Sequence, residues 1–322
     1  MSDSLVGLDA IREAHERVRS VVVRTPLHPA DALEAELGGE VRLKLESLQR
    51  TGSFKIRGAY NFVAQIPEDE RARGIITYSS GNHAQAVALA AQLHGIRAVV
   101  VMPVTAPEVK RKGAGRLGAE VVLEGTTSLQ RKVRAEAIAE ADGLVMVPPF
   151  DHPWIIAGQG TLGIEVSEDW DAFDTVLLPI GGGGLCSGSA AALRRLRPEV
   201  TIIGVEPVGA ASMRAALDAG EPVTLDRCDS VADGLLPVRT GDLTFQHVRD
   251  LVDDVVVVDD EAIRDAAALL FTKQRLVVEF SGAATVAALR SGLVDAHDRK
   301  TVAVISGGNI DPSTLVALAG AG

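Results

Sequence analysis

The run TVLLPIGGGGLCSGSAAALRRL, residues 175–196, decides the fold of this chain. It begins with a mostly apolar segment rich in β-branched residues, continues through four glycines and ends in an alanine-rich amphipathic stretch. This order is typical of one strand-helix unit of a parallel sheet. A purely structural turn would rarely use four glycines, because each loses conformational entropy on folding. Close approach of the backbone to an anion at the start of a helix explains them better.

The same alternation of strand and helix patterns extends over nearly the whole chain. The expected strands are 41–46, 75–80, 98–102, 120–123, 144–147, 175–180, 201–206, 255–258 and 301–306. The expected helices include 56–62, 82–93, 129–141, 185–196, 261–271 and 282–289. The pattern predicts an α/β protein with two doubly wound, mostly parallel sheets.

Two sheets imply two compact units within the 322 residues. The strands between 75 and 147 form a self-contained run, and Pro148-Pro149 closes it because a helix or strand cannot easily continue there. We therefore expect a small substrate-loop domain at 66–151, inserted in a larger cofactor-binding domain made of 1–65 and 152–322.

Composition narrows the class of function. Hydrophobic residues make up 47% and charged residues 23%, as in ordinary globular proteins. The formal net charge of −11 argues against nucleic acid or an anionic membrane as the main partner. Because the chain shows neither a signal-peptide pattern nor an apolar run of about 18 residues, we expect a cytoplasmic protein. The two cysteines, Cys186 and Cys228, show no metal-ligand spacing.

A lysine in a small-residue loop, Thr51-Gly52-Ser53-Phe54-Lys55, accompanies the glycine run. Most loop lysines are solvated, but the flanking glycine and phenylalanine and the helical run that follows are unusual for a surface. A lysine that forms an imine must be held in place with its charge suppressed. Together with a phosphate-binding glycine loop, this lysine indicates pyridoxal phosphate.

A second loop, Ser79-Ser80-Gly81-Asn82-His83, follows an expected strand and opens an expected helix. Backbone N–H groups at a helix N-terminus can bind a carboxylate, although an ordinary serine or asparagine cap is the alternative. His83 taken alone is better explained as a packed histidine than as a base.

A third loop begins with Ser306 at the end of the last expected strand, and its position favours a site as much as a simple turn. A dinucleotide-binding unit is the alternative explanation of the glycine run, since an acidic residue, Glu206, ends the next strand. The Gly-x-Gly-x-x-Gly fingerprint fails in both registers, because its last position falls on Cys186 or Ser187.

Together these motifs resemble the threonine dehydratase and serine racemase branch of the fold-type II, tryptophan synthase β-like pyridoxal phosphate enzymes. The resemblance covers almost the entire chain. It is carried by TGSFKIRGA (51–59), SSGNHAQ (79–85), IAGQGT (156–161), GGGGL (181–185), ADG (232–234) and SGGN (306–309).

The resemblance implies a role for each motif. Lys55 would carry the cofactor as an imine, with Phe54 beside it, and would remove the substrate α-proton. Asn82 would bond the ring hydroxyl and Ser306 the pyridine nitrogen. The phosphate would be held by Gly181, Gly182, Gly183, Gly184 and Leu185, and the substrate carboxylate by Ser79, Ser80, Gly81, Asn82 and His83.

The resemblance also implies a homodimer with its site between the domains. Glu206 and the carbonyl of Ala210 match a cation site of some family members, but Ser212 replaces a second carboxylate there. A cation near Glu206 is therefore doubtful, and the metal content stays unknown.

The expected function is a lyase that acts on a small β-hydroxy amino acid. L-threonine or L-serine would lose ammonia by α,β-elimination and yield a 2-keto acid. Alternatives are a serine racemase that uses Lys55 and Ser80 on opposite faces, and a 3-hydroxyaspartate dehydratase that uses Arg131 for the extra carboxylate. A non-catalytic ligand-binding protein is a further alternative, which retention of the whole motif set disfavours. A nicotinamide dehydrogenase would leave Lys55 unexplained.

Overall fold

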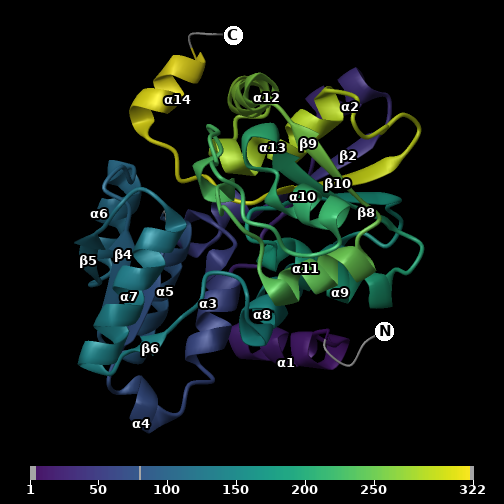
Figure 1. The fold of residues 1–322 in the computed structure, drawn as a ribbon. Coiled ribbons are helices and arrows are strands. Elements are labelled where there is room, and N and C mark those ends of the chain that lie inside the picture. Colours follow the sequence, from purple (N-terminus) through teal and green to yellow (C-terminus); the bar gives the residue numbers. More distant parts are fainter. Residues whose placement is uncertain (1–4, 80, 320–322) are drawn as a thin grey trace.

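A computed structural model of the chain contains two sheets, each with helices on both faces (Figure 1). The structure describes residues 5–79 and 81–319. Segments far apart in the sequence lie side by side in the larger sheet. Its strand at 300–305 pairs with the strand at 40–45 on one side and with the strand at 175–179 on the other.

The larger sheet has six strands in the order β1-β2-β10-β7-β8-β9. All neighbouring strands are parallel except β1, which pairs antiparallel with β2. The strands are β1 (Leu27–Pro29), β2 (Glu40–Leu45), β7 (Thr175–Pro179), β8 (Thr201–Pro207), β9 (Asp254–Val258) and β10 (Lys300–Ile305).

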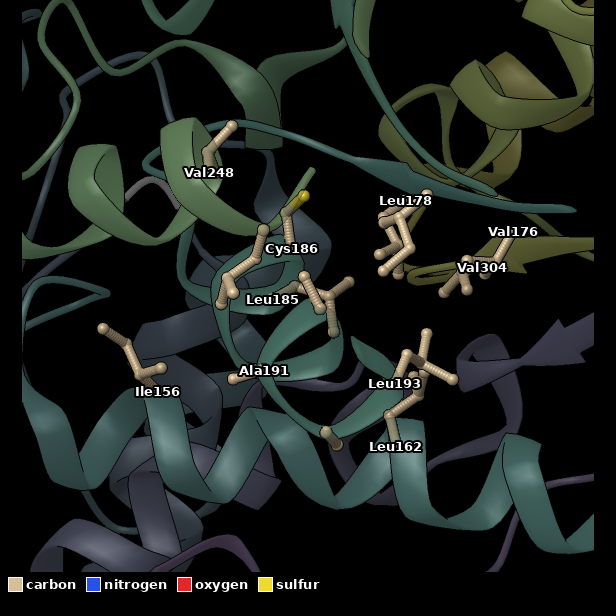
Figure 2. Close-up of a cluster of buried hydrophobic side chains, with 14 of the residues drawn as sticks. Ile156, Leu162, Val176, Leu178, Leu185, Cys186, Ala191, Leu193, Val248 and Val304 are labelled. Carbon is tan, nitrogen blue, oxygen red and sulfur yellow. The ribbon is translucent and has the colours of Figure 1, made fainter. Parts of the chain in front are cut away.

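Alternate residues of this sheet enter different cores, as the period of a strand requires. Val176 and Leu178 of β7 belong to the cluster shown in Figure 2, whereas Leu177 packs on the opposite face. The first face is covered by α1 (Leu8–Val18), α8 (Pro153–Asp169), α9 (Gly184–Leu196), α10 (Ser212–Ala219) and α11 (Asp242–Leu251). The second is covered by α2 (Asp31–Leu37), α12 (Asp260–Thr272), α13 (Phe280–Arg290) and α14 (Pro312–Ala319).

The smaller sheet has four parallel strands in the order β5-β4-β3-β6. They are β3 (Ile75–Tyr78), β4 (Ala98–Met102), β5 (Glu120–Leu123) and β6 (Val145–Met146). One face packs on α3 (Lys55–Val63), α5 (Asn82–His94) and α6 (Glu108–Arg116), and the other on α7 (Ser128–Asp142). A short helix, α4 (Glu68–Arg71), leads into β3, and 3-10 turns lie at η1 (Glu46–Leu48), η2 (Arg50–Gly52), η3 (Val208–Ala210) and η4 (Asp233–Leu235).

The predicted fold class is confirmed, and each expected strand is present, two of them (98–102 and 120–123) with the expected ends and the others with slightly shifted ends. The short edge strand β1 was not predicted, nor was α8, whose many glycines weaken its helical pattern. A Cβ on Gly158 of α8 would come within 2.6 Å of the Arg57 carbonyl oxygen, so this glycine lets α8 pack closely on α3. All strands of the smaller sheet fall within 66–151, and these domain boundaries stay a prediction.

The topology brings the expected site loops together. β2, β10 and β7 are neighbours in the larger sheet, and the loops after them carry Lys55, Ser306 and the four glycines. Parallel strands end at the same edge of a sheet, where ligands of open α/β folds bind.

None of the helices within residues 5–79 and 81–319 is long and apolar enough to cross a membrane.

Candidate active site

Lys55 begins α3 and is partly buried. Its Nζ donates a hydrogen bond to the carbonyl oxygen of Pro149 at 3.0 Å and lies 5.1 Å from the ring centre of Phe54. Burial lowers the pKa of Lys55 to about 8. Near pH 8, Lys55 is therefore a neutral amine in a large fraction of the molecules. The neutral amine is the form that attacks a carbonyl carbon or accepts a proton.

The lysine loop is attached to the end of β10. The Phe54 N–H donates to the carbonyl of Ser306 at 3.1 Å, and Ser53 forms an antiparallel bridge with Gly307. Ser306 itself is buried, and its Oγ makes a long contact of 3.5 Å to the carbonyl of Ser281. Backbone pairing thus fixes the start of α3 relative to the hydroxyl of Ser306.

Asn82 extends from α5 of the smaller sheet toward residues of the larger one. Its Oδ1 accepts a hydrogen bond from Asn309 Nδ2 at 2.9 Å, and its Nδ2 donates to Glu279 Oε1 at 2.5 Å. Because a carboxylate only accepts, these contacts fix which end of the amide is the donor. The second N–H of the Asn82 amide makes no hydrogen bond within residues 5–79 and 81–319, and so remains for another acceptor.

A buried ion cluster supports Asn82 and was not predicted from the sequence. Lys110 of α6 is 1% exposed, and its Nζ lies 2.7 Å from Asp233 Oδ2 and 3.0 Å from Glu279 Oε2. Burial is the main cause that raises the pKa of Glu279. The positive charge of Lys110 acts in the opposite direction and lowers that pKa. The stem of Lys110 lies against Gly81, where a Cβ would come within 2.2 Å of Lys110 Cδ. The cluster therefore joins the two sheets directly behind the expected substrate loop.

The four glycines lead into α9. Gly183 has φ +93°, which only glycine adopts readily, and it precedes the first turn of the helix. A Cβ on Gly182 would overlap the ring of Phe150, at 2.2 Å from its Cδ1. Phe150 follows Pro149, the partner of Lys55 Nζ, so residues 149–150 link the glycine loop to the lysine. The N–H groups of the first turn of a helix lack helical acceptors and suit a phosphate.

The expected substrate loop lies between β3 and α5. Ser79 Oγ accepts the N–H of Gly81 at 3.0 Å, which shapes the turn before the helix. His83 is buried, and burial first and the nearby charge of Lys55 second lower its pKa to about 3. His83 is thus neutral at ordinary pH, in agreement with a packed histidine. Ser80 lies outside the described residues.

Glu206 holds the start of α10 in the described structure. Its two carboxylate oxygens accept the N–H groups of Met213 and Arg214, each at 2.8 Å, and burial raises its pKa to about 7. Among residues 5–79 and 81–319, no group of three or more His, Cys, Asp or Glu side chains has the arrangement of a metal site.

These residues fit pyridoxal phosphate. They offer an amine with a lowered pKa, helix N–H donors for a phosphate and a hydroxyl at the end of β10. Ser53 Oγ adds a buried polar atom that has no hydrogen-bond partner among the described residues. Asn82 supplies the free N–H noted above. The proposed holding residues are Phe54, Lys55, Asn82, Gly181, Gly182, Gly183, Gly184, Leu185 and Ser306.

Comparison with known proteins agrees with this fold and with pyridoxal phosphate as the cofactor. The family model for pyridoxal-phosphate dependent enzymes matches residues 18–307, so the chain belongs to that family. Within it, the chain is 45% identical to the L-threonine ammonia-lyase of Thermotoga maritima, over 97% of this chain and 77% of that one. It is 40% identical to the catabolic L-threonine dehydratase of Escherichia coli K12, over 99% and 97%. The structure of maize serine racemase superposes with a TM-score of 0.92 at 38% identity, over 97% and 96%.

Proposed function

We propose that this protein is a pyridoxal phosphate-dependent ammonia-lyase that converts L-threonine, and to a lesser extent L-serine, to a 2-keto acid and ammonia. The observation that carries the proposal is the Lys55 amine, held with a pKa of about 8 beside the loops after β2, β10 and β7. The names of the two relatives support threonine as the first substrate.

Bound pyridoxal phosphate withdraws electrons from the substrate α-carbon and so makes its proton acidic. Lys55 accepts that proton, because its neutral amine is well populated near pH 8. Ser306 would hold the pyridine nitrogen of the cofactor with a neutral hydroxyl. A hydroxyl would not keep a proton on that nitrogen as a carboxylate would, so the ring would withdraw fewer electrons, which favours elimination of the β-hydroxyl.

The other loops orient the substrate. The N–H groups at the start of α5 bind the α-carboxylate, in the loop that contains Ser79, Ser80, Gly81, Asn82 and His83. Lys110 keeps this loop against the larger sheet through Asp233 and Glu279, which limits the entry of water.

A substrate panel tests the proposal. Purified holoenzyme is incubated with L-threonine, L-serine, their D-forms and the isomers of 3-hydroxyaspartate, and both the keto acid and the configuration of the remaining substrate are measured. We expect keto acid from L-threonine first and L-serine second, with little from the D-forms. Absence of keto acid from every L-substrate, although the cofactor is bound, would leave a ligand-binding protein as the better explanation.

One observation favours 3-hydroxyaspartate as a second candidate substrate. Arg131 on α7 is 7% exposed, and its Nε has no hydrogen-bond partner among the described residues, while its NH1 group donates to the Thr126 carbonyl at 3.2 Å. Burial lowers the pKa of Arg131 to about 10, and Tyr78, next to the substrate loop, is among the groups that affect it. A buried guanidinium that pairs with no carboxylate in the described part of the chain suits a second substrate carboxylate. Loss of activity toward 3-hydroxyaspartate alone in Arg131→Leu tests this assignment.

The resemblance to the family supports a homodimer as the working form, and a location in the cytoplasm is a further part of the proposal. Light scattering coupled to size-exclusion chromatography tests the dimer, and cell fractionation tests the location. A monomer with full activity would refute the dimer as the working form.

A further inference from the structure

Thr244 lies against the glycine loop and takes part in none of the chemistry described above. It belongs to the first turn of α11 and is fully buried. Its Oγ1 contacts the carbonyl oxygen of Gly182 at 2.7 Å, a closer approach than the 3.2 Å to the carbonyl of Gly241. The same Oγ1 accepts the N–H of Gly241 at 3.1 Å. Thr244 therefore donates its hydroxyl proton to the carbonyl oxygen of Gly182.

This hydrogen bond fixes the orientation of one peptide plane in the glycine loop. The carbonyl of Gly182 and the N–H of Gly183 belong to the same planar trans unit and point in opposite directions. Binding of the carbonyl by Thr244 therefore turns the Gly183 N–H away from Thr244. Without that contact the plane between two glycines can rotate at little cost, because neither residue has a Cβ that restricts it.

Thr244 is itself held by residues near the lysine. The Asp151 carboxylate accepts the N–H groups of Asp242 and Leu243 at 3.0 Å each and that of Thr244 at 3.1 Å. Ser187 Oγ, from the helix after the glycine loop, donates to the Thr244 carbonyl at 3.2 Å. Asp151 follows Pro149, the hydrogen-bond partner of Lys55, by two residues. The same segment thus positions both the lysine and the start of α11.

We propose that Thr244 is a positioning residue for the cofactor phosphate. By holding the Gly182 carbonyl, it directs the neighbouring N–H of the glycine loop toward the phosphate oxygens. The inference rests on the proposed cofactor site and predicts that Thr244 affects the phosphate alone. Binding of the pyridine ring and the aldehyde by other residues should not depend on it.

Binding of pyridoxal phosphate and of pyridoxal, which lacks the phosphate, tests this inference on the purified apoprotein. Thr244→Val removes the hydroxyl and keeps the shape. We expect its Kd for pyridoxal phosphate in equilibrium dialysis to rise about tenfold, which corresponds to one weakened charge-assisted hydrogen bond. The Kd for pyridoxal should stay within about twofold, a change too small for one lost hydrogen bond. Thr244→Ser, which keeps the hydroxyl, should bind both as the wild type does.

Thr285→Val is the matched control. Thr285 is also fully buried and also donates to a backbone carbonyl, that of Val304 at 3.1 Å, but it lies on α13, on the opposite face of the sheet. We expect this variant to keep the wild-type preference for pyridoxal phosphate. Should Thr244→Val fail to fold, Thr244→Ala gives the same comparison with Thr244→Ser.

The outcomes separate two failures. If the wild type binds pyridoxal phosphate more tightly than pyridoxal and the Thr244→Val protein keeps that preference in full, the role of Thr244 is refuted while the cofactor site stands. If the wild type shows no preference for pyridoxal phosphate, the glycine loop does not hold the phosphate, and both the cofactor site and the role of Thr244 are refuted.

Discussion

Replacing Lys110 with methionine tests whether the buried ion cluster holds the two sheets together at the site. Methionine keeps an unbranched stem against Gly81 and removes the ammonium that contacts Asp233 and Glu279. The two carboxylates then face each other without a cation. Removal of one partner of a buried ion pair costs about 3–5 kcal/mol. Asp233 is 33% exposed and can regain water, so we expect a loss of about 3 kcal/mol, at the lower end of that range.

The loss should depend on pH. Burial already raises the pKa of Glu279, and removal of Lys110 raises it further because the cation lowers it. A carboxyl group whose pKa is raised by folding stabilises the folded state at pH values below its unfolded pKa and loses this contribution as the pH rises through the folded pKa. The stability lost in Lys110→Met should thus shrink as the pH falls toward the ordinary glutamate pKa of 4.5 and grow as the pH rises above it.

Urea unfolding of the holoenzyme, followed by tryptophan fluorescence with excess pyridoxal phosphate, measures the effect. Lys112→Met is the control on the same helix, because Lys112 forms an exposed pair with Glu108 that water screens, and its loss should change the unfolding free energy far less than the loss of Lys110. Adding Glu279→Gln to Lys110→Met should recover part of the loss, because glutamine still accepts from Asn82 without a charge. Equal unfolding free energies for Lys110→Met and Lys112→Met would refute the reasoning.

Four further predictions concern the site. Lys55→Ala should abolish covalent cofactor binding and turnover, since the amine is lost, while circular dichroism stays unchanged; keto-acid production near the wild-type level would contradict this. Covalent capture of pyridoxal phosphate by the apoprotein, followed by absorbance, should speed up as the pH rises through about 8, because the lowered pKa of Lys55 frees the amine there; a midpoint near the usual lysine value of 10.5 would refute the burial argument. Gly183→Val should weaken cofactor affinity in dialysis strongly, since φ +93° excludes a β-branched residue, and unchanged affinity would move the phosphate elsewhere. Ser80→Ala should lower any L-to-D conversion of serine by about 10²–10⁴-fold and elimination from the L-substrate much less, as a lost proton carrier on one face implies; equal D-serine formation by both proteins in chiral chromatography would remove Ser80 from the catalytic residues.

The sequence by itself determined the fold class and the chemistry of the cofactor. The strand periodicity at 175–180 and 301–306 and the glycines at 181–184 are local patterns, and each was readable without knowing its neighbours in space. Lys55 also stood out locally, because glycine and phenylalanine flank it. The helix α8 was missed for the opposite reason, since its glycines are explained only by close packing on α3.

Only the tertiary structure decided which polar side chains support these motifs. Lys110 and Asp233 are 123 residues apart, and Thr244 and Gly182 are 62 apart, so no periodicity or spacing links them. The residues around Lys110 are mostly charged, as in a surface helix. Lys110 is nevertheless buried, because α6 packs against the loop at Gly81. Hydrogen bonds and ion pairs act over a few ångströms between atoms, whatever their distance along the chain. The loops that carry the chemistry can therefore be predicted from the sequence. The residues that hold those loops in place can be identified only in the tertiary structure, where the two sheets are packed together.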